Sequence, residues 1–412
     1  MPTDADLMRR ALGLAGRGRG WVNPNPMVGA VVVSPAGEIV AEGYHPRVGG
    51  PHAEVVALAA AGEAARGATL YVTLEPCTHH GRTPPCTDAI LRAGVSRVVY
   101  ACDDENPLTA GRGKAVLEAA GIAVVTAVEE AAARELNAPF FKFVRTRMPY
   151  VLCKMAASLD GKIATASGAS KWISGPEARA LVQEWRATYA GVMVGIGTVL
   201  ADDPGLRCQL PGAHEAARVV VDPLAATPLT ARLFEGEGPV FIAVGPAASP
   251  EAIQRLRERG ARIVICPKRS SAGETPGESL QTSVVSAGGV QPESPGGTGA
   301  ESTGGASERS IGRKGPPLEG IDLTVLLREL SHNAVSSLLC EGGGGLNAAL
   351  LRQGLIDKIA IFLAPLLLGG ARAPTVVDGS DLADLSAAIR VSGLRARPIG
   401  DDILLEGEIQ QA

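Results

Sequence analysis

The chain has few aromatic residues and no long hydrophobic run. Phe, Trp and Tyr make up 3% of its 412 residues. The longest apolar run, residues 359–368, is interrupted by Pro365 and falls well short of the roughly 20 residues that a membrane helix needs. The first residues include acidic side chains and lack the apolar centre of a secretory signal. We therefore expect a cytoplasmic protein that neither enters a membrane nor is exported.

Positive charge is also scarce. The formal net charge is −4 at pH 7, so we expect no broad basic face for a nucleic-acid backbone, and any anionic ligand must be held by local residues. The seven cysteines are odd in number and scattered, which favours a reducing compartment in which some thiols are free to bind a metal. These features indicate a globular protein without a nucleic-acid or membrane partner.

Helical and strand patterns alternate along the chain, in two successive halves. A chain of this length is too long for one ordinary core, and we expect two α/β domains, residues 1–147 and 148–412. The boundary is placed near Met148 because "NAPFFKFVRTRMP" is typical of a connector. Residues 268–317 are mostly Gly, Ser, Thr, Pro and Glu, and we expect them to form a disordered insertion that carries no chemistry.

A cluster of metal-binding residue types stands in the first half. "PHAE" contains His52, and "EPCTHHGRTPPC" contains Cys77 and Cys86. Zinc favours His nitrogen and Cys thiolate, and a catalytic site keeps three protein ligands and an open position. Pro51 and Pro85 stand at predicted helix starts, whose partial positive charge favours thiolate. Each ligand alone would more readily be a buried histidine or a core thiol, but the combination predicts a catalytic zinc site.

Glu54 is the predicted catalytic acid and base. A carboxylate beside the metal can take a proton from the attacking water and return it to a leaving amine. Zinc deaminases combine a His/Cys/Cys site with a non-ligand Glu, in the pattern H-x-E followed by P-C-x-x-C. The second cysteine departs from that pattern, because Cys86 comes nine residues after Cys77 instead of three.

The longer cysteine spacing points to one family. "TLEPCTHHGRTPPC", "NPNPMVGAVVV", "GYH" and "ENPLTAGRG" resemble the deaminase half of the bifunctional riboflavin biosynthesis deaminase/reductase family. The resemblance implies a cytidine-deaminase-like zinc domain. An Asn such as Asn25 can read a pyrimidine edge, and an Arg such as Arg82 can pair with a phosphate. The alternatives are that Asn25 is only a turn residue, and that His79 and Arg82 are only exposed polar residues of a loop. The substrate-binding residues implied by the resemblance are Asn25, His45, His79 and Arg82.

A glycine run marks the second half. "CEGGGGLNAALLRQG", residues 340–354, lies between a predicted strand and a predicted helix, where backbone N–H groups can hold phosphate. It is not G-x-G-x-x-G, so alone it indicates a tight turn as readily as a cofactor loop. With "KMAASLDGKIA", "SKWIS" and "GIGTVLADDP" it resembles the reductase half of the same family. That resemblance implies a dihydrofolate-reductase-like α/β fold and NADPH.

The same resemblance implies roles for individual residues of the second half. Lys and Arg side chains can hold phosphate, and Asp and Glu can accept hydrogen bonds from sugar hydroxyls or amines. For Trp172 and Thr198 the alternative is ordinary packing. The implied cofactor-binding residues are Ala156, Trp172, Thr198, Asp202, Gly343, Gly344, Gly345, Leu346, Asn347, Ala348 and Ala349. The implied substrate-binding residues are Lys154, Ser170, Arg186, Leu206 and Glu341.

One departure from the family concerns the substrate phosphate. The family usually reads D-D-P-x-L-T-x-R, with the last arginine near that phosphate. This chain reads "DDPGLRCQ", which puts Arg207 two places early and Gln209 in the arginine's place. We therefore hypothesise that Arg207 reaches the phosphate.

The resemblance implies a bifunctional enzyme of riboflavin biosynthesis. Its zinc domain would deaminate 2,5-diamino-6-hydroxy-4-(5-phosphoribosylamino)pyrimidine by hydrolysis. Its NADPH domain would then reduce the ribose side chain to give 5-amino-6-(5-phosphoribitylamino)uracil. The expected partners are these phosphorylated pyrimidines and further copies of the chain. Two alternatives stay open: a cytidine, guanine or tRNA deaminase with an unrelated second domain, and a structural zinc beside a non-catalytic nucleotide-binding module.

Overall fold

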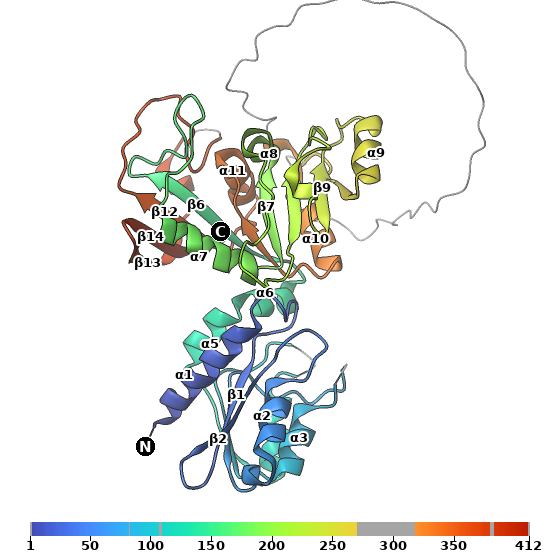
Figure 1. The fold of residues 1–412 in the computed structure, drawn as a ribbon, viewed down its shortest axis with the longest axis vertical. Coiled ribbons are helices and arrows are strands. Elements are labelled where there is room, and N and C mark those ends of the chain that lie inside the picture. The colour runs from blue at the N-terminus through green and yellow to red at the C-terminus, as the bar shows by residue number, and fades with distance from the viewer. Residues whose placement is uncertain (1, 82, 107–108, 270–317, 380–382, 411–412) are drawn as a thin grey trace, which may run out of the picture.

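The chain forms two α/β units, each built around its own sheet and joined end to end (Figure 1). The structure is a computed structural model that describes residues 2–81, 83–106, 109–269, 318–379 and 383–410. Arg82 and nearly all of the insertion expected at residues 268–317 lie outside the described residues. Within the described ranges, no helix is long and apolar enough to cross a membrane.

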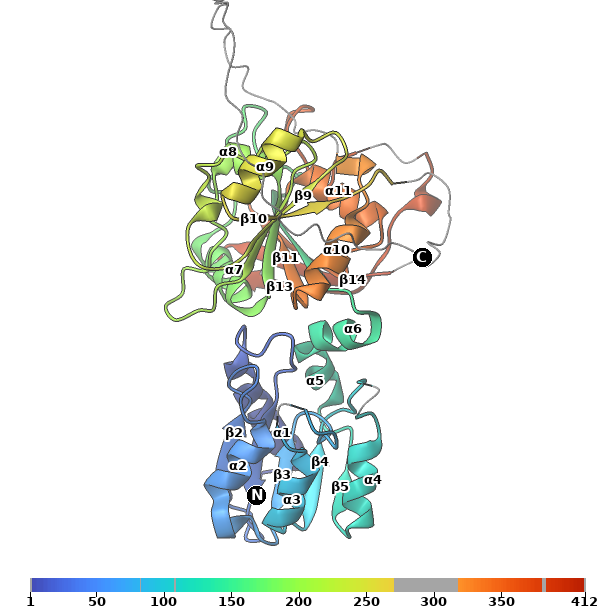
Figure 2. The same ribbon diagram turned by 90° about the vertical axis from the view of Figure 1, so that its right-hand side faces the viewer.

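The first unit is a five-stranded sheet with helices packed on it (Figure 2). The strand order is β2-β1-β3-β4-β5; β1 pairs antiparallel with β2 and β3, whereas β3, β4 and β5 are parallel. The strands are β1 (Gly29–Val33), β2 (Ile39–Tyr44), β3 (Thr69–Val72), β4 (Arg97–Tyr100) and β5 (Ala123–Val125). The helices are α1 (Asp4–Ala15), α2 (Ala53–Ala61), α3 (Cys86–Ala93) and α4 (Arg112–Ala119).

Two glycines let helices approach this sheet closely. A Cβ on Gly29 of β1 would lie 2.0 Å from the carbonyl oxygen of Ala11 in α1, and one on Gly43 of β2 would lie 2.6 Å from that of Ala53 in α2. Side chains larger than hydrogen are therefore excluded at both positions. This packing fixes the first turn of α2, which carries Glu54, against the sheet.

The second unit is a nine-stranded sheet in the order β10-β9-β8-β7-β11-β6-β12-β14-β13. All neighbours from β10 to β12 are parallel, and β14 and β13 complete the sheet antiparallel. The parallel strands are β6 (Tyr150–Ser158), β7 (Gly191–Gly195), β8 (Ala217–Val221), β9 (Val240–Val244), β10 (Ala261–Ile265), β11 (Ser337–Cys340) and β12 (Lys358–Ala364). The antiparallel strands are β13 (Val391–Ile399) and β14 (Asp402–Ile409).

The central strands of this sheet are buried along their length, as in parallel sheets covered on both faces. The carboxyl ends of β7, β11 and β6 are neighbours, and α8 and α11 begin just after β7 and β11. Binding sites of such sheets gather at that edge. The helices are α7 (Pro176–Thr188), α8 (Ile196–Asp202), α9 (Pro250–Glu258), α10 (Leu323–His332) and α11 (Gly344–Arg352).

Two helices, α5 (Glu130–Leu136) and α6 (Ala138–Thr146), lead from the first unit to β6. The boundary expected at Met148 lies between α6 and β6. Lys142 of α6 donates to Asp357 Oδ2 at 2.6 Å, and the same oxygen accepts from the Val151 N–H at 2.7 Å. On another side, Asn23 Nδ2 donates to the Thr188 carbonyl oxygen at 3.1 Å. The two units are thus attached at α6 and at the end of α7.

Candidate functional site

The three predicted metal ligands lie together in the first unit. His52 is the residue before α2, Cys86 begins α3, and Cys77 follows β3. One ligand atom of each lies within 4.8 Å of the others. His52 Nδ1 is 3.1 Å from Cys86 Sγ and 3.6 Å from Cys77 Sγ. The sequence thus places two of the three ligands at helix starts, and the fold brings the third close to both.

The surroundings of the two thiols favour a negative charge on Cys77. A hydrogen bond from the Cys86 thiol, with help from His52, lowers the pKa of Cys77 to about 4. The hydrogen bond with Cys77 and burial raise the pKa of Cys86, and the hydrogen bond with Cys77 raises that of His52. Two sulfurs and an imidazole nitrogen are the donor types of a catalytic zinc site, and zinc binds the thiolate form. These residues therefore fit zinc.

Glu54 lies in the first turn of α2, beside the cluster. Its side chain is buried, with 4% of the residue exposed. Burial raises the pKa of this carboxyl above its ordinary value. A carboxyl group with a raised pKa can both take and return a proton near neutral pH, as a general acid and base must.

A cavity of about 440 Å³ opens onto these residues, a size suited to a small molecule. Asn25, His45 and His79, three of the predicted substrate-binding residues, line it. His45 Nδ1 donates to the Pro51 carbonyl oxygen at 2.9 Å, which leaves Nε2 to accept from Asn25 Nδ2 at 3.2 Å. Burial lowers the pKa of His45 and so favours this neutral form. Arg82, the fourth predicted residue, lies outside the described part of the chain.

Further residues that were not predicted from the sequence also line the cavity, among them Thr83, Asp104, Asn106 and Phe140. Thr83 Oγ1 lies 3.4 Å from His52 Nε2, and Asp104 accepts from the Asn106 N–H at 2.9 Å. Burial raises the pKa of Asp104 to about 6. Asp104 and Asn106 follow a strand of the parallel part of the sheet, and that position alone could have identified them. Phe140 carries no such signal.

The loop that bears Asp104 rests on a buried carboxylate, Glu75. Glu75 Oε2 accepts from the backbone N–H of Asp104 at 3.3 Å and of Gly111 at 3.0 Å, and Oε1 accepts from that of Gly113 at 2.9 Å. Gly113 packs so closely that a Cβ there would lie 2.2 Å from the Pro76 carbonyl oxygen. Glu75, the first residue of "EPC", therefore holds a second loop of the cavity in place through hydrogen bonds to its backbone.

In the second unit, three predicted substrate residues form one charged group. Arg186 of α7 binds Glu341 with two hydrogen bonds, Nε to Oε1 at 2.6 Å and NH2 to Oε2 at 2.9 Å. Burial opposes the charge on Glu341, but Arg186 and Lys154 outweigh it, and the pKa of Glu341 is lowered. Burial lowers the pKa of Lys154, whose position on β6 adjoins β11. The charged group lies at the carboxyl edge described above.

The predicted cofactor loop is the start of α11. Gly343 precedes the helix, and Gly344 is packed so that a Cβ would lie 2.4 Å from the Thr375 carbonyl oxygen. Gly345 is exposed with nothing within 4 Å of a Cβ position. The residues that follow in the predicted set are buried: Leu346, Asn347, Ala348 and Ala349. A ligand at this loop would therefore meet backbone N–H groups rather than those four side chains.

The Asn347 side chain, on α11, also contacts other parts of the second unit. Its Oδ1 accepts from the Cys153 thiol at 3.3 Å, and its Nδ2 donates to the Val376 carbonyl oxygen at 2.8 Å. The side chain thus joins β6 to the segment that covers the start of α11. This is a packing role beside the predicted cofactor role.

The remaining predicted cofactor residues surround the same edge. Trp172 is 69% exposed, and the Arg179 guanidinium lies 4.6 Å from the centre of its ring. Its neighbour Lys171 pairs with Asp202 at 3.2 Å, at the end of α8. Thr198 of α8 and Ala156 of β6 are half-buried. An exposed tryptophan beside a helix end leaves a flat apolar face for a ring of a ligand.

The remaining predicted substrate residues are Ser170, Leu206 and Arg207. Ser170 is half-buried, and Leu206 is buried with a φ of 53°. The Arg207 side chain pairs with Glu215 at 2.7 Å, while its carbonyl oxygen accepts from Arg186 NH1 at 3.2 Å. Gln209 is exposed, and its N–H donates to Gln183. The Arg207 backbone therefore adjoins the charged group, but its guanidinium is held by another carboxylate.

Each unit matches a known domain family. Residues 1–102 match the cytidine and deoxycytidylate deaminase zinc-binding region, and residues 149–405 match the RibD C-terminal domain. These matches confirm the predicted pairing of a cytidine-deaminase-like zinc domain with a dihydrofolate-reductase-like domain. They also confirm zinc and NADPH as the cofactors. The second match contradicts the alternative in which the second domain is unrelated to riboflavin biosynthesis.

Full-length relatives are similar over nearly the whole chain. The riboflavin biosynthesis protein RibD of Escherichia coli is 39% identical over 98% of both chains. That of Actinobacillus pleuropneumoniae is 38% identical over 98% of this chain and 95% of its own length. The solved structure of Acinetobacter baumannii RibD has a TM-score of 0.77 at 36% identity and covers 99% of each chain.

A second solved structure carries the activity in its name. A diaminohydroxyphosphoribosylaminopyrimidine deaminase/5-amino-6-(5-phosphoribosylamino)uracil reductase from Thermotoga maritima has a TM-score of 0.74 at 32% identity, covering 99% of both chains. The region of similarity includes both units, and with them the zinc ligand cluster and the glycine loop. The chain belongs to the RibD family of riboflavin biosynthesis proteins, which combine a deaminase with a reductase.

Proposed function

We propose that residues 1–147 deaminate 2,5-diamino-6-hydroxy-4-(5-phosphoribosylamino)pyrimidine and that residues 148–412 reduce the product to 5-amino-6-(5-phosphoribitylamino)uracil. The observation that carries the first step is the His52, Cys77 and Cys86 cluster, whose ligand atoms lie within 4.8 Å of one another beside buried Glu54. The match of residues 149–405 to the RibD C-terminal domain supports the second step.

In the first step, Glu54 moves the protons. Zinc held by His52, Cys77 and Cys86 supplies the Lewis acidity that makes water a nucleophile near neutral pH. Glu54 takes a proton from the water that attacks the amine-bearing ring carbon, and gives it to the departing ammonia. Asn25 and His79 orient the pyrimidine in the cavity, and Arg82 is the proposed partner of its phosphate.

In the second step, charged side chains hold the ribose phosphate chain. NADPH, when bound, supplies the hydride that reduces C1 of the opened sugar. The proposed cofactor contacts are the backbone of Gly343 to Gly345 and the residues around Trp172, Thr198 and Asp202. Lys154 donates to the sugar or its phosphate, and the pairing with Arg186 keeps Glu341 ionised as an acceptor.

We keep Arg207 as the proposed phosphate contact. Its carbonyl oxygen accepts a hydrogen bond from Arg186, so its side chain begins beside the charged group that Arg186 forms with Glu341 and Lys154. The pair with Glu215 is partly exposed, with 47% of the Arg207 side chain accessible, and a pair of that kind is weak. A phosphate with two negative charges can therefore compete with Glu215 for this guanidinium.

The proposal extends to assembly and location. We propose a homo-oligomer formed through β13, the edge strand, because most of its residues are exposed, including Leu394 at 60%. An exposed edge strand that presents apolar side chains such as Leu394 invites pairing with another copy of the same strand. We also propose that the enzyme works in the cytoplasm, on phosphorylated small molecules and without a nucleic-acid or membrane partner, as its net charge of −4 favours.

The experiment that tests the proposed function is a coupled assay on the purified chain. The pyrimidine phosphoribosyl substrate is added with NADPH, and ammonia release and NADPH oxidation are followed together while zinc is measured. The proposal expects both signals and about one zinc per chain. Zinc without either signal would favour the alternative of a structural zinc beside a non-catalytic nucleotide-binding module.

A further inference from the structure

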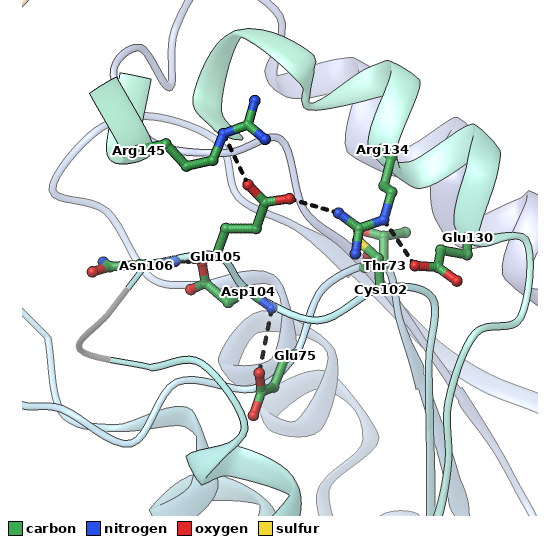
Figure 3. Close-up of polar contacts among 9 residues, drawn as sticks. All are labelled: Thr73, Glu75, Cys102, Asp104, Glu105, Asn106, Glu130, Arg134 and Arg145. Atoms are coloured by element: carbon green, nitrogen blue, oxygen red, sulfur yellow. Dashed lines mark hydrogen bonds and ion pairs between the residues drawn. The ribbon is translucent and has the colours of Figure 1, made fainter. Parts of the chain in front are cut away.

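Glu105 lies between two residues that line the cavity of the first unit. Asp104 and Asn106 both contribute to the cavity wall, whereas Glu105 itself does not. Its side chain points away from them, toward Arg134 and Arg145 (Figure 3). The loop after β4 thus presents its flanking residues to the substrate space and its middle residue to the connecting helices.

The Glu105 carboxylate is shared by two arginines. Oε1 accepts from Arg134 NH1 at 2.8 Å, and Oε2 lies 3.3 Å from Arg145 Nε (Figure 3). Arg134 of α5 also donates through Nε to Glu130 Oε1 at 2.8 Å. Its guanidinium lies 5.5 Å from the centre of the Phe141 ring. The Glu105 side chain is only 24% exposed, so this network is more rigid than an isolated surface pair.

One of the two helices at the other end of this network, α6, forms another part of the cavity. Phe140 of α6 lines the cavity, and its neighbour Phe141 is buried in the core of the first unit. Arg145 lies on the same helix as Phe140. The helix is fixed in turn to the second unit by the Lys142 contact with Asp357. Glu105 therefore joins the loop that carries Asp104 and Asn106 to the helix that carries Phe140.

We propose that Glu105 is a positioning residue of the deaminase, which sets the distance between these two walls of the cavity. The inference rests on the proposed function, because it concerns the substrate of that cavity. Glu105 touches neither the metal ligands nor the cavity, so its loss affects how tightly the substrate is held and not the proton transfer by Glu54. Loss of a wall contact made equally in the ground state and the transition state raises KM and leaves kcat nearly unchanged.

The test compares Glu105→Gln with Glu130→Gln in the full-length, zinc-loaded chain. Both substitutions remove a carboxylate that pairs with Arg134, but only Glu105 belongs to the cavity loop. Ammonia release gives KM and kcat of the deaminase. NADPH oxidation with the deaminated pyrimidine gives the reductase rate as an internal reference. We expect Glu105→Gln to raise the deaminase KM by about fivefold, the scale of one partly exposed ion pair, with kcat and the reductase within twofold.

Several outcomes would overturn the inference. They are an unchanged deaminase KM in Glu105→Gln, an equal rise in Glu130→Gln, and a fall in kcat at unchanged KM. If Glu105→Gln loses zinc or reductase activity as well, Arg145→Gln decides instead, since that side chain is 60% exposed and its loss should spare the fold. An unchanged KM in Arg145→Gln would then reject the proposal. No ammonia release by the parent chain would overturn the proposed function itself, and the inference with it.

Discussion

The surroundings of a cysteine decide what it can do in this protein. The pKa of Cys77 falls to about 4 beside Cys86 and His52. Burial raises the pKa of Cys102 and of Cys266 to about 12 each. A thiol whose pKa is raised in this way stays protonated and packs as a small apolar group. The residue type alone predicts neither behaviour, whereas the proline and helix start beside Cys86 predict its ligand role.

The first prediction concerns Cys77. Replacing it with serine removes a zinc ligand, so the zinc content of the purified chain should fall, and thermal stability of the first unit should fall with it because metal binding and folding are coupled. Cys208→Ser is the matched control, since Cys208 is half-buried in the second unit, where it donates to the Gln183 carbonyl oxygen and accepts from the Leu210 N–H. Equal zinc in Cys77→Ser and the parent would refute the ligand assignment.

The second prediction concerns Arg207. Arg207→Ala should raise the reductase KM for the phosphorylated substrate by about tenfold, as expected when a charged group loses its phosphate contact. The deaminase of the same chain should be unaffected. Arg255→Ala, an exposed arginine on α9, serves as the control. If steady-state kinetics show the same reductase KM in Arg207→Ala and Arg255→Ala, Arg207 does not bind the phosphate.

At the scale of elements, the chemistry gathers at the starts of helices. His52 and Glu54 flank the start of α2, Cys86 begins α3, and the glycine run leads into α11. Each of these starts is visible in the sequence as a proline or glycine between a strand pattern and a helix pattern. That is why the sequence could place the predicted metal ligands at helix starts, whereas the glycine run alone indicated a tight turn as readily as a cofactor loop.

Other parts of the site depend on contacts between distant elements and leave no local signal. Phe140 reaches the cavity because α6 lies beside the loop after β4, where Arg145 pairs with Glu105. The Arg186 pair with Glu341 joins residues 155 positions apart. The family resemblance implied that Arg186 and Glu341 bind substrate, but the sequence could not predict that the two side chains bind each other. It also could not predict that Glu215 would hold the Arg207 side chain.

The third prediction concerns the start of α11. Gly344→Ala places a methyl group 2.4 Å from the Thr375 carbonyl oxygen and 2.6 Å from the Asp378 carboxyl carbon, so one segment must move. We expect a loss of about 1–3 kcal/mol in stability, which is the usual cost of overpacking, together with weaker NADPH binding. Gly345→Ala is the control, because a Cβ there meets nothing within 4 Å. Thermal unfolding without NADPH checks the prediction, and equal melting temperatures for the two variants would contradict it.

At the scale of the whole molecule, the sheet of the second unit leaves an exposed edge strand. The second sheet ends at β10 on one side and at β13 on the other, and β13 is largely exposed along its length. The alternation of helices and strands predicted two α/β units. The order of strands was not predictable in this way, because pairing between β6, β11 and β12 joins segments far apart in the chain. The predicted insertion lies almost wholly outside the described residues.

The fourth prediction follows from the exposed edge. Leu394→Glu places a charge on β13, where Leu394 is 60% exposed, and should shift the protein from oligomer to monomer. Ile265→Glu makes the same change on β10, the opposite edge of the same sheet, where Ile265 is 56% exposed. Light scattering coupled to size exclusion measures the mass. A parent chain that is already monomeric, or an oligomer that survives Leu394→Glu, would reject β13 as the interface.

The central claim is that one chain carries two separate chemistries, with Glu54 serving only the first. Its most direct test is Glu54→Gln, which keeps the zinc ligands and removes the proton carrier. The variant is given the diamino pyrimidine substrate in one assay and the deaminated uracil compound in another, each with NADPH, and its zinc is measured. The account predicts retained zinc, loss of ammonia release by about a hundredfold or more, and an unchanged rate of NADPH oxidation with the deaminated compound. Undiminished ammonia release, or loss of zinc or of NADPH oxidation, would contradict it.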